Sequence, residues 1–168
     1  MRKKKKSKAQ IIRDWGMGDY RSSNLRYKTP IEKGIYWYWF SLHVRQRDVE
    51  QYGTCISCNK PITVDTCDAG HYIPASSCGR DLLFDPLNVH AECSRCNAFD
   101  EGHLFGYEKG LIERYGEETV NNLKDRYFEY KSGGVLKDFK GSEYAEKIKQ
   151  LSSYQRHMKN NAEQCDIL

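Results

Sequence analysis

Four cysteines form two pairs with the spacing of a metal-binding site. Cys55 and Cys58 are separated by two residues, as are Cys93 and Cys96, and 34 residues lie between the pairs. Zinc prefers four thiolate ligands at the corners of a tetrahedron, and a Cys-x-x-Cys knuckle presents two sulfurs at that geometry. We therefore expect one structural zinc ion, which would stabilise a region too small to fold on its own core. The simplest alternative is a zinc ribbon with no further chemistry.

The other three cysteines, Cys67, Cys78 and Cys165, bring the total to seven. An odd count, with four cysteines in Cys-x-x-Cys pairs, favours metal binding in a reducing compartment over a disulfide framework. We expect these three residues to be free thiols, and we expect Cys67 to pack in or beside a strand.

Three residues inside or beside the cysteine frame could hydrolyse a phosphodiester. His71 follows Asp-Ala-Gly, Asn88 stands in Leu-Asn-Val-His, and Asn97 directly follows the last cysteine of the frame. A strand histidine, a turn asparagine and a residue that opens a helix give the order of an HNH, or ββα-metal, nuclease site. A phosphodiester repels nucleophiles and has a poor leaving group, so such a site needs a base and a divalent cation.

Each of these residue types suits one role in that chemistry. Neutral imidazole can act as a base near pH 7, so His71 is the candidate base. Asn97 can offer its carbonyl oxygen to a hard cation such as Mg²⁺ or Mn²⁺, and Asp68 is the candidate second ligand because it is the nearest carboxylate on the same strand. Asn88 is expected to hold the loop by backbone hydrogen bonds and so to orient His71. His103 could be a further cation ligand or simply a helix-start residue.

Structural roles are the alternative for each of these residues. A lone histidine is more often structural than catalytic, and His90 could form a hydrogen bond within its loop. A lone asparagine after a cysteine also indicates little by itself. The joint placement of His71, Asn88 and Asn97 around a four-cysteine frame nevertheless favours a nuclease.

A long helix is expected before the cysteine frame. Thr29-Pro-Ile-Glu is typical of a helix start, because threonine can cap, proline suits the first position and glutamate can reach back. Apolar residues at helical spacing extend this helix to about Gln51. Residues 36–40 are all aromatic, and we expect them to pack in a core or an oligomer interface rather than to stack on nucleic-acid bases.

The region after this helix is rich in turns and predicts an α+β fold class. We expect strands at residues 62–64 and 68–74, followed by a return through residues 82–84. Apolar residues at three- and four-residue steps then predict two helices, which end at Gly116 and before Ser132. A last helix is expected from Ser142.

These elements predict a small zinc-stapled ββα-metal (HNH-like) core, flanked by an N-terminal helix and C-terminal helices. The expected division is a basic arm (1–28), an aromatic-rich helix (29–52), the nuclease core (53–116) and a C-terminal helical extension (117–168).

The positive charge of the chain is concentrated at its start. The first eight residues carry six positive charges and no acid, whereas the whole chain has a net charge of +4. Such an arm would bind DNA or RNA by releasing counterions, or it could be a solvated tail. The mean hydropathy is −0.81. No apolar stretch reaches the roughly 20 residues of a membrane span, and no apolar run follows the basic start, so we expect a cytoplasmic protein.

Several short motifs between residue 55 and about residue 120 occur together in one known family. They are Cys55-Ile-Ser-Cys58, Asp68-Ala-Gly-His71-Tyr72, Phe84 with Asn88-Val-His90, Cys93-x-x-Cys96-Asn97, Gly102-x-Leu104 and the helix segment 111–116. With these motifs the chain resembles the phage NinG family of recombination endonucleases, of the HNH/ββα-metal class. It departs from the commonest HNH pattern at Gly70, where an acid usually precedes the base, and Asp68 is our candidate to fill that gap. His103 stands where asparagine would be expected.

The resemblance implies an enzyme that cleaves branched recombination intermediates, such as Holliday junctions and D-loops, in the cytoplasm of a phage-infected cell. Its cofactors would be a structural Zn²⁺ and a catalytic Mg²⁺ or Mn²⁺. Resolution of a junction needs two symmetric nicks, so a homodimer is expected. The alternatives are a less selective HNH nicking endonuclease and a catalytically inactive, zinc-stabilised DNA-binding protein.

Overall fold

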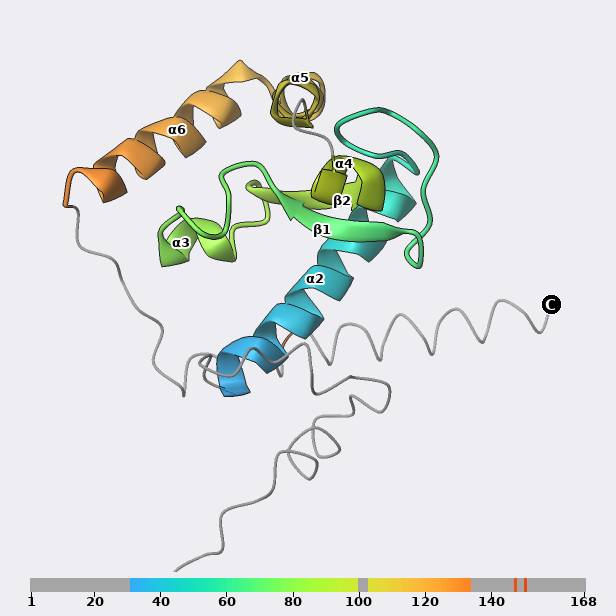
Figure 1. Ribbon diagram of the computed structural model, residues 1–168, viewed down its shortest axis with the longest axis horizontal. Coiled ribbons are helices and arrows are strands. Elements are labelled where there is room, and N and C mark those ends of the chain that lie inside the picture. Colours follow the sequence, from blue (N-terminus) through green and yellow to red (C-terminus); the bar gives the residue numbers. More distant parts are fainter. Residues whose placement is uncertain (1–30, 100–102, 134–146, 148–149, 151–168) are drawn as a thin grey trace, which may run out of the picture. The chain divides into compact units, whose positions relative to one another are not determined.

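The computed structural model describes residues 31–99, 103–133, 147 and 150 (Figure 1). The chain forms two compact units, one of Met1–Trp39 with Phe139–Leu168 and the other of Phe40–Asp138. The described elements combine helices with a two-stranded sheet, which confirms the α+β class. The basic arm, the helix start at Thr29, most of the last predicted helix and Cys165 lie outside the described residues.

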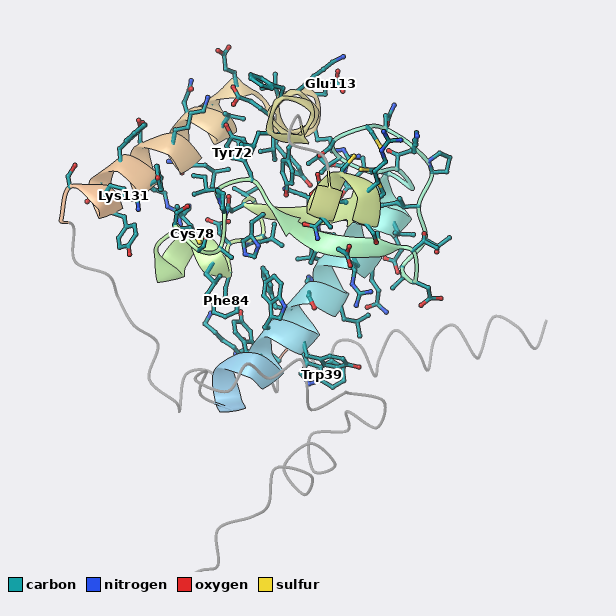
Figure 2. All side chains as sticks on the ribbon, in the orientation of Figure 1. Trp39, Tyr72, Cys78, Phe84, Glu113 and Lys131 are labelled. Atoms are coloured by element: carbon teal, nitrogen blue, oxygen red, sulfur yellow. The ribbon has the colours of Figure 1, made fainter. Side chains whose placement is uncertain are left out.

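The predicted first helix is present as α2 (Ile31–Gln51). It ends where Gly53 adopts a φ of 65°, a left-handed conformation that glycine accepts without steric cost. Two of its aromatic residues, Tyr36 and Phe40, are buried. The ring of Phe40 packs edge-on against Phe84, with 5.8 Å between the ring centres (Figure 2). Core packing is therefore confirmed for Phe40.

The sheet is an antiparallel hairpin of β1 (Cys67–His71) and β2 (Val89–Cys93). Its register pairs Gly70 with His90 and His71 with Val89. Because successive side chains on a strand point to opposite faces, the hairpin has two different surfaces. We call them the His71 face, which also carries Val89, and the Gly70 face, which also carries His90.

Two details of the predicted strands are wrong. Residues 62–64 are not a strand, because the hydroxyl of Thr66 bonds the backbone N–H of Thr63 at 2.9 Å and closes a local turn instead. Residues 82–84 are not a return strand either. Residues Arg80–Leu83 form the short helix α3, and the chain returns only with β2.

The outer edge of β2 is covered by the segment that precedes the hairpin. The backbone N–H of Ala91 donates to a carboxylate oxygen of Asp48 in α2 at 2.7 Å. The carbonyl of Ala91 accepts from the N–H of Ile56 at 3.2 Å. The N–H of Cys93 points to the sulfur of Cys55 at 3.3 Å. A two-stranded hairpin is marginal by itself, so these contacts stabilise β2 and hide its edge.

The two helices predicted after the cysteine frame are α5 (His103–Tyr115) and α6 (Glu117–Lys131), joined at Gly116 with a φ of 86°. A Cβ at Gly110 would lie 2.1 Å from the carbonyl oxygen of Ile56, so glycine is required where α5 crosses the first cysteine knuckle. Tyr72 and Cys78 pack in or against the core that these helices form (Figure 2). The buried members of this core are Ile56, Tyr72, Ile73, Leu82, Tyr107, Leu111, Val120 and Leu123. Among the described residues, no helix is both long and apolar enough to cross a membrane.

Candidate functional site

The two cysteine pairs come from different local structures. Cys55 and Cys58 lie in a tight turn, closed by a 2.9 Å hydrogen bond from the N–H of Asn59 to the carbonyl of Cys55. Asn59 has a φ of 57°, a conformation that asparagine tolerates better than most residues. Cys93 ends β2, and Cys96 follows within the short helix α4 (Ser94–Phe99).

The fold brings all four cysteines together, as their spacing predicted. The four sulfur atoms lie within 4.8 Å of one another, and those of Cys58 and Cys93 are 3.8 Å apart. Tetrahedral zinc with Zn–S bonds of about 2.3 Å separates its sulfurs by roughly 3.8 Å. The cluster therefore fits one metal ion of this kind. Cys67, the first residue of β1, is buried, and neither it nor the half-buried Cys78 is in a disulfide.

His71 ends β1, and the backbone holds its ring. Nε2 lies 3.0 Å from the carbonyl oxygen of Leu83, the last residue of α3. A carbonyl oxygen only accepts hydrogen bonds, so Nε2 carries the proton and Nδ1 of the neutral ring is the acceptor. Burial lowers the pKa of His71, and its hydrogen bond to Leu83 offsets this only in part. The neutral ring that a base requires is therefore the favoured form at pH 7.

Asn88 stands in the turn before β2 and is fully buried. Its side-chain oxygen accepts from the N–H of Ile73 at 2.8 Å, and its amide donates to the carbonyls of Leu82 and Ile73 at 2.9 and 3.2 Å. These are the backbone hydrogen bonds expected for a residue that ties the loop. Because they join the segment after β1 to the end of α3, they fix both sides of the His71–Leu83 contact.

Asn97 lies in α4 beside Gly70. A Cβ at Gly70 would lie 3.1 Å from Oδ1 of Asn97 and 2.3 Å from Oε2 of Glu92. Both oxygens therefore border the space that a side chain at position 70 would fill. Asn97 is exposed, whereas Glu92 is completely buried.

The other two predicted cation ligands are Asp68 and His103, and the described part of the structure gives Asp68 no hydrogen bond to Asn97. Asp68 is half-buried on β1 and stands directly across the hairpin from Glu92, on the Gly70 face. His103 is the first residue of α5, and its side chain lies outside the described residues. The structure therefore brings Asn97 and a carboxylate oxygen together at Gly70, but that carboxylate belongs to Glu92. Sequence reasoning missed Glu92. The signal that could have found it is an acid on the same face of the hairpin as Gly70, two residues beyond His90, the strand partner of that glycine.

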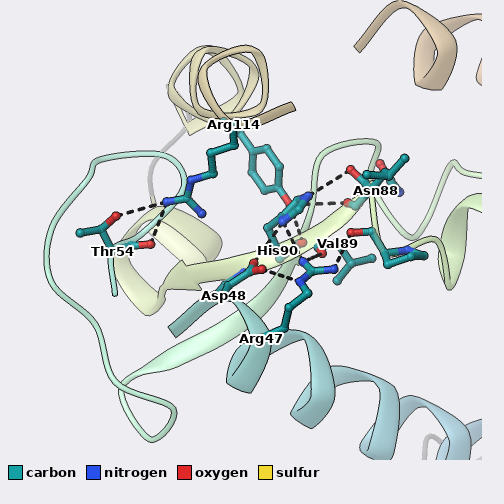
Figure 3. A network of polar contacts seen from close by, with 12 residues as sticks. Arg47, Asp48, Thr54, Asn88, Val89, His90 and Arg114 are labelled. Atoms are coloured by element: carbon teal, nitrogen blue, oxygen red, sulfur yellow. Dashed lines mark hydrogen bonds and ion pairs between the residues drawn. The ribbon is translucent and has the colours of Figure 1, made fainter. Parts of the chain in front are cut away.

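His90 belongs to a polar network rather than to the Gly70 space (Figure 3). Nδ1 of His90 lies 3.0 Å from a carboxylate oxygen of Asp48, and both side chains are fully buried. Arg47 donates to the other oxygen of Asp48 at 2.6 Å. Burial alone would raise the pKa of Asp48, but hydrogen bonds from His90 and Arg47 outweigh it and lower the pKa to about 2. This network fastens α2 to β2.

Comparison with known proteins gives consistent results. A family model described as "Bacteriophage Lambda NinG protein" matches residues 3–155. The NinG protein of Escherichia phage lambda is 32% identical over 110 residues, which cover 64% of this chain and 51% of that protein. The NinG protein of Salmonella phage P22 is 34% identical over 109 residues, with the same two shares. That of Escherichia phage 933W is 36% identical over 84 residues, 50% of this chain and 40% of that protein.

The chain thus spans about half the length, or less, of the curated relatives it matches. No solved structure matches it. The family model covers most of the chain, including all of the cysteine frame, His71, Asn88 and Asn97. The chain therefore belongs to the NinG family of bacteriophage proteins.

Proposed function

We propose that this protein is a metal-dependent endonuclease that hydrolyses phosphodiester bonds in branched DNA, such as Holliday junctions and D-loops, during phage recombination. One observation carries the proposal. A histidine held through Nε2 directly follows a glycine position around which an amide oxygen and a carboxylate oxygen gather. A base beside a pair of oxygen ligands is what phosphodiester hydrolysis requires.

The role of His71 is to remove a proton from the attacking water. Its acceptor is Nδ1, because Nε2–H donates to the carbonyl of Leu83. The same carbonyl stabilises the positive charge that the ring gains when Nδ1 takes the proton, and it holds the ring in one orientation. Asn88 acts as a positioning residue, since it binds the backbone on both sides of this contact.

The second part of the proposal is a divalent cation at the Gly70 face. Asn97 would hold it through its carbonyl oxygen, together with a carboxylate, for which the sequence suggested Asp68, and with His103 as a further ligand. Carboxylate and amide oxygens are the donors that Mg²⁺ and Mn²⁺ prefer. When bound, the cation would offset the negative charge on the phosphate and on the leaving oxygen.

The two faces of the hairpin suit an in-line reaction. The side chain of His71 and the direction of a side chain at Gly70 point to opposite faces, because the two residues are neighbours on β1. In phosphoryl transfer the attacking and leaving oxygens stand roughly in line, on opposite sides of phosphorus. A phosphodiester at the end of β1 could thus meet the base on one side and the cation on the other.

In this proposal, zinc at the four cysteines is structural. A full shell of four thiolates leaves no open coordination position for water or substrate. Because Cys96 directly precedes Asn97 and Cys93 directly follows Glu92, the zinc site would fix the position of both oxygen donors.

Cleavage of model substrates tests the proposal. The zinc-loaded protein is incubated with a four-way junction and with a linear duplex of the same sequence, in Mg²⁺, Mn²⁺ or excess chelator. We expect metal-dependent nicks in the junction, loss of cleavage in His71→Ala, and full cleavage by His43→Ala, a matched substitution in α2. No cleavage by the unaltered protein, or full cleavage by His71→Ala, would contradict the proposal.

The same experiment separates the alternatives. Equal cleavage of junction and duplex would indicate a less selective nicking endonuclease. Junction binding without cleavage under any metal would indicate a zinc-stabilised DNA-binding protein. The mass of the protein in solution, alone and on a junction, tests the proposed homodimer, which two symmetric nicks require.

A further inference from the structure

Glu92 is a completely buried carboxylate on β2. The hydroxyl of Ser57, inside the first cysteine knuckle, donates to its Oε1. A buried carboxylate is costly unless hydrogen bonds or a cation offset its charge. The bond from Ser57 fixes the side chain so that the other oxygen, Oε2, lies over Gly70.

Glu92 fills space that the residue before His71 would otherwise use. A Cβ at position 70 would lie 2.3 Å from Oε2 and 3.2 Å from the Cβ of Glu92. A Cβ contact of 2.3 Å does not occur in proteins, so a side chain at position 70 and Oε2 of Glu92 in its present place exclude one another. The carboxylate of Glu92 therefore reaches across the hairpin into the space beside Gly70.

Asn97 borders the same space through its Oδ1, 3.1 Å from that Cβ position. A carboxylate oxygen and an amide carbonyl oxygen are both donors that a hard divalent cation prefers, and both border this one space. Asn97 is itself exposed to solvent, whereas Glu92 is not.

We propose that Glu92 and Asn97 form a divalent-cation site, in which Glu92 supplies from β2 the carboxylate that Gly70 cannot supply from β1. Glu92 is favoured over Asp68, because Oε2 of Glu92 is the atom nearest to a Cβ at position 70. Cation binding stands independently of the proposed function, while the use of that cation in DNA cleavage rests on it.

Calorimetric titration of Mn²⁺ into the zinc-loaded full chain, without DNA, tests this site. We expect Glu92→Gln, which keeps the shape of the side chain, to weaken Mn²⁺ binding by at least about tenfold. Asp68→Asn distinguishes the two candidate carboxylates, because loss of binding in that variant would assign the site to Asp68 instead. The matched control Glu113→Gln, which alters an exposed carboxylate of α5, should bind within about twofold of the unaltered protein. Asn97→Asp should retain binding, since it keeps an oxygen donor in place.

A relocated carboxylate makes the test more specific. Gly70→Asp alone should weaken Mn²⁺ binding, since its Cβ would collide with Glu92. The double variant Gly70→Asp with Glu92→Ala should recover binding, because the carboxylate then comes from β1. Zinc content and circular dichroism verify the fold of each variant, and Glu92→Gln decides the question if the double variant does not fold.

Unchanged Mn²⁺ binding by Glu92→Gln, or loss of binding only in Asp68→Asn, would overturn the proposal. Absence of Mn²⁺ binding by the unaltered protein would overturn it too. Junction cleavage is measured separately. If Glu92→Gln loses Mn²⁺ but the unaltered protein cuts no DNA, the cation site stands and the endonuclease proposal fails.

Discussion

The buried carboxylates of Asp48 and Glu92 both lie at β2, and their surroundings differ. Asp48 lies at the outer edge of the strand, where a backbone N–H, a histidine and an arginine contact its two oxygens at 2.6–3.0 Å. Glu92 projects from the strand itself, with Ser57 at one oxygen and the Gly70 space at the other. Both side chains are fully buried.

The difference teaches how to tell a structural acid from a candidate ligand when burial is equal. The neighbours of Asp48 are donors, and they join α2 to β2 (Figure 3). An oxygen of Glu92 shares its surroundings with the carbonyl oxygen of Asn97, which is another acceptor. Hydrogen bonds to both oxygens of Asp48 tie two elements together, whereas an amide oxygen beside the Glu92 carboxylate forms a pair of donors that a hard cation prefers.

The largest loss of stability is expected when a cysteine of the four-cysteine cluster is replaced. Cys93→Ser removes one of four sulfurs at the end of β2, and structural zinc contributes roughly 10 kcal/mol or more to folding in small domains. We expect loss of zinc and of the folded structure, measured by zinc content and circular dichroism. Cys78→Ser, outside the cluster, should keep both. A folded, zinc-free Cys93→Ser protein would show that the frame is dispensable.

Substitutions of Asp48 and Glu92 should differ in their effect on the free energy of unfolding. Asp48→Ala leaves the N–H of Ala91, His90 and Arg47 without their acceptor, and breaking such a buried pair costs about 3–5 kcal/mol. Glu92→Gln keeps its shape and should change the free energy of unfolding by less than about 1 kcal/mol in the absence of divalent cation. Urea unfolding of both variants measures this. Equal destabilisation would indicate that Glu92 is structural as well.

Acid should weaken the Asp48 region in a defined pH window. The pKa of Asp48 is lowered from 3.8 to about 2, so the folded protein binds this proton less readily than the unfolded chain. Its contribution of about 2 kcal/mol is present above pH 4 and is lost as the pH falls toward 2. Asp48→Asn should lack this contribution at every pH. Parallel unfolding curves for the two proteins between pH 5 and 2.5 check it, and an unchanged difference between them would contradict it.

Local patterns in the sequence were sufficient for much of the fold. The helices that became α2, α5 and α6 follow from apolar spacing and from glycines at their ends, and the four cysteines follow from their knuckles. The return strand was misplaced because Leu82 and Phe84 have the alternation of a strand but lie in and after a short helix. Their burial comes from packing onto distant elements, which local periodicity does not report.

The site was harder to predict because its contacts join residues far apart. Asp48 and Ala91 are 43 positions apart, and Ser57 and Glu92 are 35 apart. No spacing rule connects such pairs. Gly70 was visible as a departure from the HNH pattern, but only the hairpin register shows that Glu92 can reach its space.

Single-turnover cleavage of a four-way junction by the unaltered protein and by His71→Ala is the most direct test of the base at the end of β1. We expect His71→Ala, with zinc content and fold unchanged, to cleave about 10²–10⁴-fold more slowly, because a general base contributes that much. Since burial lowers the pKa of His71 from its ordinary 6.5, the rate of the unaltered protein should rise with pH, and the midpoint of that rise should lie below pH 6.5. Cleavage by His71→Ala at the unaltered rate, with the same pH profile, would contradict the assignment.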